Sequence, residues 1–170
     1  MRSSPPRRQF QSLPVTLVAQ GAEYAAAEAT AVAHDNARAV PVFISGATGV
    51  HAAAINGFFE PTQDKGPDGR LILTKRGNAG MLMEHTAGRW RVKSVSDKGT
   101  TSCNAYFEGG CALAACTSRQ WRVGNGKTFS DAPGVKMVTG AEAERKVSGC
   151  RLRAHQHALL PPVSASNRFL

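Results

Sequence analysis

The sequence predicts an α+β, mainly-β fold: a single-domain antiparallel meander of about six or seven short strands over residues 42–138. A phrase that occurs twice, Arg-Trp-Arg-Val at 89–92 and Gln-Trp-Arg-Val at 120–123, alternates large apolar residues with polar ones. Such alternation is typical of a strand with one buried and one exposed face. The two tryptophans are therefore expected in the core, with the arginines directed outward.

The chain before residue 42 is expected to be helical rather than β. Residues 1–20 contain arginine and serine but no acidic residue, a composition that fits an organellar targeting segment or a disordered tail equally well. Residues 21–40 are alanine-rich and predict a helix that ends before Pro41. No secretory segment is evident, so we expect an intracellular protein, with its compartment open.

The expected strands are short apolar segments bounded by glycine, proline and asparagine turn signals. The clearest turn signal is Asn125-Gly126, which predicts a hairpin with a type I′ turn. The candidate segments lie at residues 42–44, 58–60, 71–75, 81–85, 89–95, 104–108, 119–123, 127–129 and 135–138.

After the last strand, Thr139 and Glu142 have the spacing of a capping box. They predict a short C-terminal helix that ends at Gly149, a residue suited to the C′ position. The β-rich module with this helix is thus expected over residues 41–149, and residues 150–170 are expected to form a flexible tail.

The chain of 170 residues carries a net charge of +9, spread over its body and tail. This charge favours anionic partners, either an acidic protein or nucleic acid, although it also serves solubility alone. No apolar run approaches the ~20 residues of a membrane span. Arg89, Arg91 and Lys93 share one face of their predicted strand, and Arg122 would join them if the second tryptophan strand lies nearby. We expect a basic sheet face there, used either for binding or merely for solvation.

Four cysteines, at 103, 111, 116 and 150, allow free thiols, disulfides or a metal site. Their spacing lacks the tight Cys-x2-Cys pair of a persuasive zinc site, so free buried thiols are the preferred interpretation, and no cofactor is expected. His85 follows Met81 and Met83 at strand spacing and is expected to be a hydrogen-bonded core or rim residue. No catalytic constellation is recognisable.

The segment from Phe43 to Gly49 is similar to the strand-and-turn opening of dinucleotide-binding Rossmann domains, with Gly46 and Gly49 approaching a pyrophosphate. The long helix and alternating strands that such a domain requires do not follow. A small NAD(P)-binding oxidoreductase fragment therefore remains only the alternative function.

Several landmarks occur in a fixed order: Ile55–Thr62, Asp68–Arg70, Glu84-His85, Ala115–Val123 and Val138–Glu142. In this order the chain resembles, over residues 50–148, a β-rich repeat module of roughly ninety residues, within the size of an independent domain. That module recurs, often in tandem arrays, in large uncharacterised proteins of unicellular eukaryotes. The resemblance carries no active site or cofactor and implies a non-enzymatic interaction or scaffold role, as an accessory part of a larger assembly.

Overall fold

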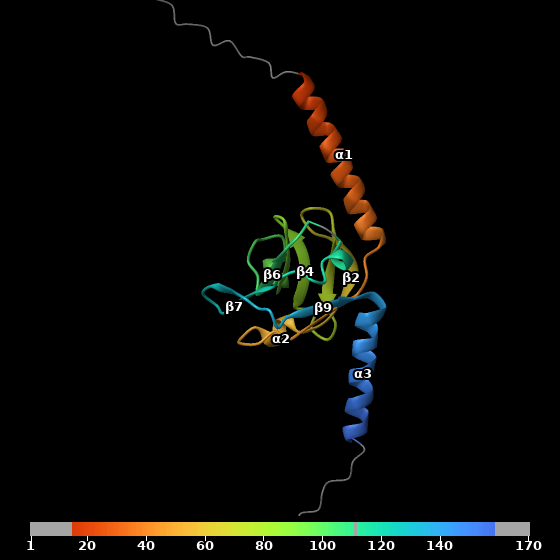
Figure 1. The fold of residues 1–170 in the computed structure, drawn as a ribbon, viewed down its shortest axis with the longest axis vertical. Coiled ribbons are helices and arrows are strands. Elements are labelled where there is room, and N and C mark those ends of the chain that lie inside the picture. The colour runs from red at the N-terminus through yellow and green to blue at the C-terminus, as the bar shows by residue number, and fades with distance from the viewer. Residues whose placement is uncertain (1–14, 111, 159–170) are drawn as a thin grey trace, which may run out of the picture.

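The computed structural model describes residues 15–110 and 112–158, and in this part of the chain nine strands form one sheet, accompanied by three α-helices (Figure 1). The mainly-β fold is as predicted, but the expected number of strands was too low. All nine candidate segments overlap one of these strands, including the segments 119–123 and 127–129, so only the expected count of six or seven was too low. The strands are β1 Val42–Ser45, β2 Gly57–Lys65, β3 Leu71–Lys75, β4 Met81–Thr86, β5 Arg89–Ser94, β6 Ala105–Glu108, β7 Arg122–Gly124, β8 Phe129–Asp131 and β9 Lys136–Thr139.

The sheet is an antiparallel meander that curls into an open half-barrel. Strands β1 to β8 pair in sequence order, and β9 returns to pair with the free edge of β1. The two edge strands β8 and β9 are separated by only four residues, 132–135. In a flat sheet these edges would lie about 38 Å apart, at ~4.8 Å per strand. A four-residue link spans at most about 18 Å, so the sheet must curl to bring its edges together.

Alternate residues of each strand point into the half-barrel and form its core. Val42, Phe59, Met83, Val92 and Phe107 are fully buried there. Both tryptophans are also in the core, as the repeated phrase predicted: Trp90 is 3% exposed and Trp121 1%. The rings of Trp121 and Phe107 pack edge to face with their centroids 4.8 Å apart, an arrangement favoured by aromatic quadrupoles.

The type I′ turn expected at Asn125-Gly126 occurs instead at another hairpin. Thr86 pairs with Arg89, so Ala87 and Gly88 are the central residues of the β4–β5 turn, and both have positive φ (48° and 72°). Two positive φ values are the mark of a type I′ turn. The Asn125 hairpin forms, but its tight turn spans residues 125–128, and Gly126 has the only positive φ within it. That geometry is of type II′ rather than the expected I′.

Both terminal helices, α1 and α3, are longer than expected. Helix α1 spans Val15–Ala37, so it begins inside the predicted leader and just after Pro14. Helix α3 spans Gly140–Ala158 and continues through Gly149, where we expected it to end. A glycine costs a helix interior only about 1 kcal/mol and does not by itself stop it. The expected tail beyond residue 158 and the N-terminal 14 residues lie outside the described residues.

The remaining helical segments are short. Helix α2 spans Ala52–Ile55, and the 3-10 turns η1 and η2 span Val95–Asp97 and Leu113–Ala115. Next to η2, Cys116 is buried and disulfide-bonded, contrary to the expected free thiol, whereas Cys103 is free and half-buried.

Candidate functional site

The four residues of the predicted basic face lie on the outer side of β5 and β7, but two of them are not exposed. Arg91 is 5% exposed and Lys93 is fully buried. The loop between β5 and β6 folds back over both side chains. Arg91 Nη1 donates to Thr101 O at 3.0 Å, and Lys93 Nζ donates to Thr100 O at 2.6 Å. The expectation that all four side chains face solvent is therefore corrected for Arg91 and Lys93.

Lys93 also forms an ion pair with Glu84 that has no contact with solvent. Its Nζ lies 2.5 Å from Glu84 Oε1, and both side chains are 0% exposed. The same carboxylate oxygen accepts bonds from Thr86 Oγ1 at 3.0 Å and from the backbone N–H of Gly99 at 2.8 Å. This lysine thus fastens a loop to the sheet and is not offered to a partner.

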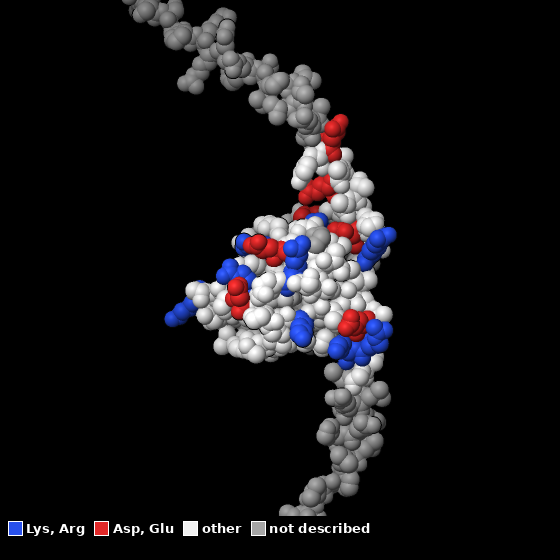
Figure 2. Space-filling view, in the orientation of Figure 1, with Lys and Arg blue, Asp and Glu red and all other residues white. Residues whose placement is uncertain are grey.

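The other two basic residues, half-buried Arg89 and exposed Arg122, are already paired. Arg89 Nη2 lies 2.9 Å from Glu108 Oε1, and Arg122 Nε lies 3.3 Å from Asp131 Oδ1. Both arginines also contact Tyr106. Figure 2 shows basic side chains lying beside acidic ones in several places on the visible face, without one continuous basic patch. Binding through Arg89 and Arg122 remains a prediction.

The glycines of the dinucleotide-binding alternative follow β1 but do not open onto a long helix. Strand β1 has antiparallel neighbours on both sides, and α2 has a single turn of four residues. The Asn56 side chain bonds both the N–H and the carbonyl of Ala47 (2.9 and 2.8 Å), which fixes the loop from within. Gly46 is needed because a Cβ there would lie 2.0 Å from the Gly134 carbonyl oxygen.

A buried polar cluster that sequence reasoning did not assemble lies at one end of the half-barrel. Arg70, only 6% exposed, is its centre. Its Nε lies 3.3 Å from Asp35 Oδ2, its Nη1 2.6 Å from Asp68 Oδ2, and its Nη2 donates to Gly110 O at 2.7 Å. One guanidinium therefore links helix α1, the β2–β3 turn and the segment after β6.

His85, 5% exposed, completes this cluster as the hydrogen-bonded histidine that we expected. Its Nδ1 bonds the Asp68 carboxylate and its Nε2 lies 3.0 Å from Gly109 O. Burial raises the pKa of Asp68, but the hydrogen bonds from His85 and Arg70 outweigh it and leave that pKa below its ordinary value. Since Nδ1 also lies 3.4 Å from Arg70 Nη1, both ring nitrogens of His85 are engaged within the cluster.

The cluster also fixes the C-terminal end of helix α1 against the barrel. Asn36 Nδ2 donates to Gly69 O at 2.9 Å, and Asn36 Oδ1 accepts from the N–H of Leu71 at 2.8 Å. Together with the Asp35–Arg70 pair, these bonds dock a helix end onto the β2–β3 hairpin. The residues just after the helix therefore have a defined position over the open end of the barrel.

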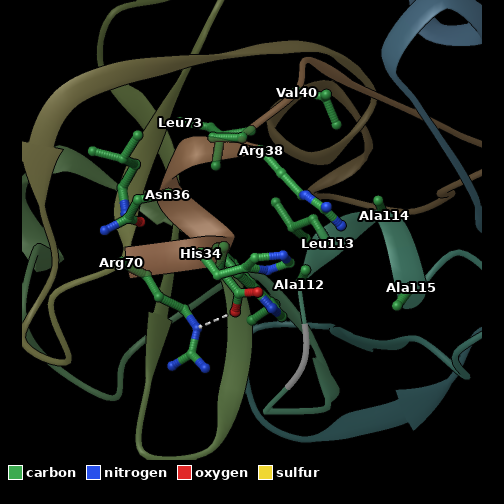
Figure 3. Close-up of a pocket in the computed structure, with 14 residues that line it drawn as sticks. His34, Asn36, Arg38, Val40, Arg70, Leu73, Ala112, Leu113, Ala114 and Ala115 are labelled. Atoms are coloured by element: carbon green, nitrogen blue, oxygen red, sulfur yellow. Dashed lines mark hydrogen bonds and ion pairs between the residues drawn. The ribbon is translucent and has the colours of Figure 1, made fainter. Parts of the chain in front are cut away.

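Beside this docked helix end lies a cavity of about 310 Å³ (Figure 3). Its wall is largely apolar, with Trp90 and Leu73 from the sheet and Leu113 from η2. Polar groups come mainly from one side, the end of α1. The full lining consists of His34, Asp35, Asn36, Arg38, Ala39, Val40, Arg70, Leu71, Leu73, Trp90 and 112–115.

The sequence contained part of the signal for this site. Asp68–Arg70 and Glu84-His85 were landmarks of the module resemblance, but no role could be assigned to them. An arginine two residues after an aspartate in a Gly-containing turn, followed by a strand histidine, is compatible with many surface turns. Arg70 and His85 meet because β3 pairs with β4 in the register that sets Leu73 opposite Met83, and Asp35 reaches them across 35 sequence positions.

No model of a known protein family matches this chain, and searches of curated proteins and of solved structures give no match either. Among the described residues, no group of three or more histidine, cysteine, aspartate or glutamate side chains is placed to hold a metal ion. Within that same part of the chain, neither long helix is apolar enough to cross a bilayer.

Proposed function

We propose that the chain is a non-enzymatic interaction module that binds a small, mostly apolar group in the cavity at the open end of its half-barrel. The cavity itself is the observation that carries this proposal. Its volume of about 310 Å³ is at the lower end of the range for small-molecule sites, and a few polar groups at one side of an apolar wall are typical of such sites.

The buried cluster supports a binding role because it holds the cavity wall in place. Arg70 bonds Asp35 on helix α1 and Gly110 near η2, the two segments that face each other across the cavity. A wall fixed before binding reduces the ordering cost that a ligand must offset. The buried charged groups each have structural partners, which favours binding over chemistry: Lys75, for example, donates to the carbonyl groups of Ala53 and Ala54.

The module resemblance is compatible with this role, and an accessory position in a larger assembly remains part of the proposal. The basic face is no longer its central element, since Arg91 and Lys93 are buried. Recognition is instead assigned to the end of the barrel where α1 docks.

A fragment screen with two matched variants tests the proposal. A panel of aromatic fragments of about 10–15 heavy atoms, a size that suits such a small pocket, would be measured by ligand-observed NMR on the wild type. Ala112→Trp places a large ring in the cavity wall, whereas Ala79→Trp adds the same ring at an exposed turn. We expect fragments to bind the wild type and Ala79→Trp but not Ala112→Trp. Equal binding by all three proteins, or no binding at millimolar fragment, would overturn the proposal.

A further inference from the structure

We propose that the ligand of this cavity is a small amphipathic carboxylate, whose apolar part packs against Trp90 and Leu113 and whose carboxylate is bound by Arg38, with His34 beside it. The inference rests on the proposed function, because it names the chemistry of the occupant of the same cavity. It follows from the charges at the rim, from their lack of protein partners and from the apolar wall opposite them.

The polar groups that form the rim come from the last turn of α1 and the residue that follows it. His34 belongs to the helix, and Arg38 comes directly after it. Figure 3 shows both side chains reaching into the pocket on the side where Leu113 lies. Both are exposed, so a ligand can reach them.

Neither side chain has a partner among the described residues. Only the backbone N–H of Arg38 forms a bond, to Asp35 O at 3.2 Å. This contrasts with Arg70, Arg76, Arg89, Arg91 and Arg122, each of which contacts a carboxylate or a carbonyl oxygen. An arginine left unpaired beside an apolar cavity offers a planar fork of donors that matches a carboxylate.

The rest of the lining does not cancel this charge. Of the described residues that line the cavity, Asp35 alone is acidic, and it is already paired with Arg70. The three nitrogens of the Arg70 guanidinium donate to Asp35, Asp68 and the carbonyl of Gly110. The uncompensated positive charge at the cavity is therefore that of Arg38, to which His34 adds a ring N–H donor.

The apolar wall selects the other half of the ligand. Leu73, Trp90 and Leu113 are each at least nine-tenths buried and turn apolar surface toward the cavity. Burial of apolar ligand atoms there supplies affinity, while the arginine fixes orientation. A purely polar anion would leave this wall uncovered, and a purely apolar ligand would leave Arg38 unused.

The test compares one carboxylate with its neutral amide. 4-Phenylbutyrate and 4-phenylbutyramide would be titrated by calorimetry into the wild type, Arg38→Gln and Arg119→Gln. Arg119 is an exposed arginine whose side chain has no partner among the described residues and which does not line this cavity, so it controls for loss of one positive charge. We expect the carboxylate to bind the wild type about tenfold more tightly than the amide, as for a charge-assisted hydrogen bond. That preference should vanish in Arg38→Gln and persist in Arg119→Gln.

Each other outcome overturns a stated part of the proposal. Equal binding of acid and amide overturns the carboxylate inference and leaves the cavity as a binding site. A preference that survives in Arg38→Gln places the anion elsewhere and also overturns it. If neither compound binds and the fragment screen is negative as well, the proposed function fails together with the inference.

Discussion

Replacement of Lys93 by methionine is the sharpest test of how the outer face of the sheet is held. The substitution removes the ammonium but keeps an unbranched apolar side chain of similar length. Glu84 would then keep a fully buried carboxylate that has lost its one charged partner among the described residues. Breaking a buried pair on one side costs about 3–5 kcal/mol, because an uncompensated charge stays in the interior.

In thermal unfolding that loss corresponds to a drop in Tm of about 9–15 °C, at roughly 3 °C per kcal/mol for a chain of 170 residues. Urea unfolding of wild type and variant, followed by tryptophan fluorescence, would give the free energies themselves. The matched control is Lys98→Met, since Lys98 pairs with Asp64 at 3.0 Å on the surface, where side-chain exposures are 43% and 69%. Exposed pairs contribute about 0–1 kcal/mol.

A second substitution separates loss of the pair from loss of lysine itself. Glu84→Gln in the Lys93→Met background removes the stranded charge, so the double variant should be more stable than Lys93→Met alone by about 2 kcal/mol. Two results would refute the reasoning: a cost for Lys93→Met no larger than that for Lys98→Met, or a double variant no more stable than the single one. Either would mean that Lys93 is a surface residue, as the strand pattern alone suggested.

Three further predictions concern the turns and the buried cluster. Ala87→Gly should stabilise the protein by about 1 kcal/mol, because Ala87 is exposed and holds φ at 48°, a conformation that costs L-residues about that much; a lowered Tm would contradict this. Gly46→Ala should lower the free energy of unfolding by several kcal/mol, because the new Cβ would meet the Gly134 carbonyl oxygen. Gly49→Ala, also at positive φ but in open space, should lower it by only about 1 kcal/mol. Similar urea midpoints for the two variants would rule out the clash. Asp68 should stabilise the fold in a way that depends on pH below about 4. The pKa of Asp68 in the folded protein lies below its ordinary value of 3.8. Its stabilising contribution is therefore complete above pH ~4 and is lost as pH falls through the folded pKa. The unfolding free energy of Asp68→Asn should therefore vary less with pH below 4 than that of the wild type, and parallel curves would exclude the contribution.

The sequence was informative where local pattern and tertiary environment agree. The alternation around Trp90 and Trp121 predicted a buried side for each strand, and both rings are in the core. Turn residues marked the strand boundaries well enough to predict a meander. Alternation could not show whether the opposite side of a strand meets water, however, because a covering loop has no periodic signature.

The same limit explains why the candidate site was missed. Its members come from the end of α1, the β2–β3 turn, strand β4 and the segment after β6, and no two of the charged ones are close enough in sequence to form a motif, except Asp68 and Arg70. Their proximity results from strand pairing from β3 to β6 and from the docking of α1, which depend on contacts between distant parts of the chain. Arg38 illustrates the point: in sequence it is one basic residue after an alanine-rich helix, without a charged neighbour to suggest a site.

Burial and pairing together decide which of the basic residues is free to bind. Lys93 and Arg91 are held under a loop, while Arg89 and Arg122 have carboxylates within 3.3 Å. A partner that used Arg89 or Arg122 would have to displace an existing ion pair, so its net gain would be small. Arg38 has no such pair within the described part of the chain, and it lies beside the apolar wall of a preformed cavity. An anion that binds there gains a charge-assisted bond without that cost, which is why recognition is better assigned to the end of the barrel than to its basic strands.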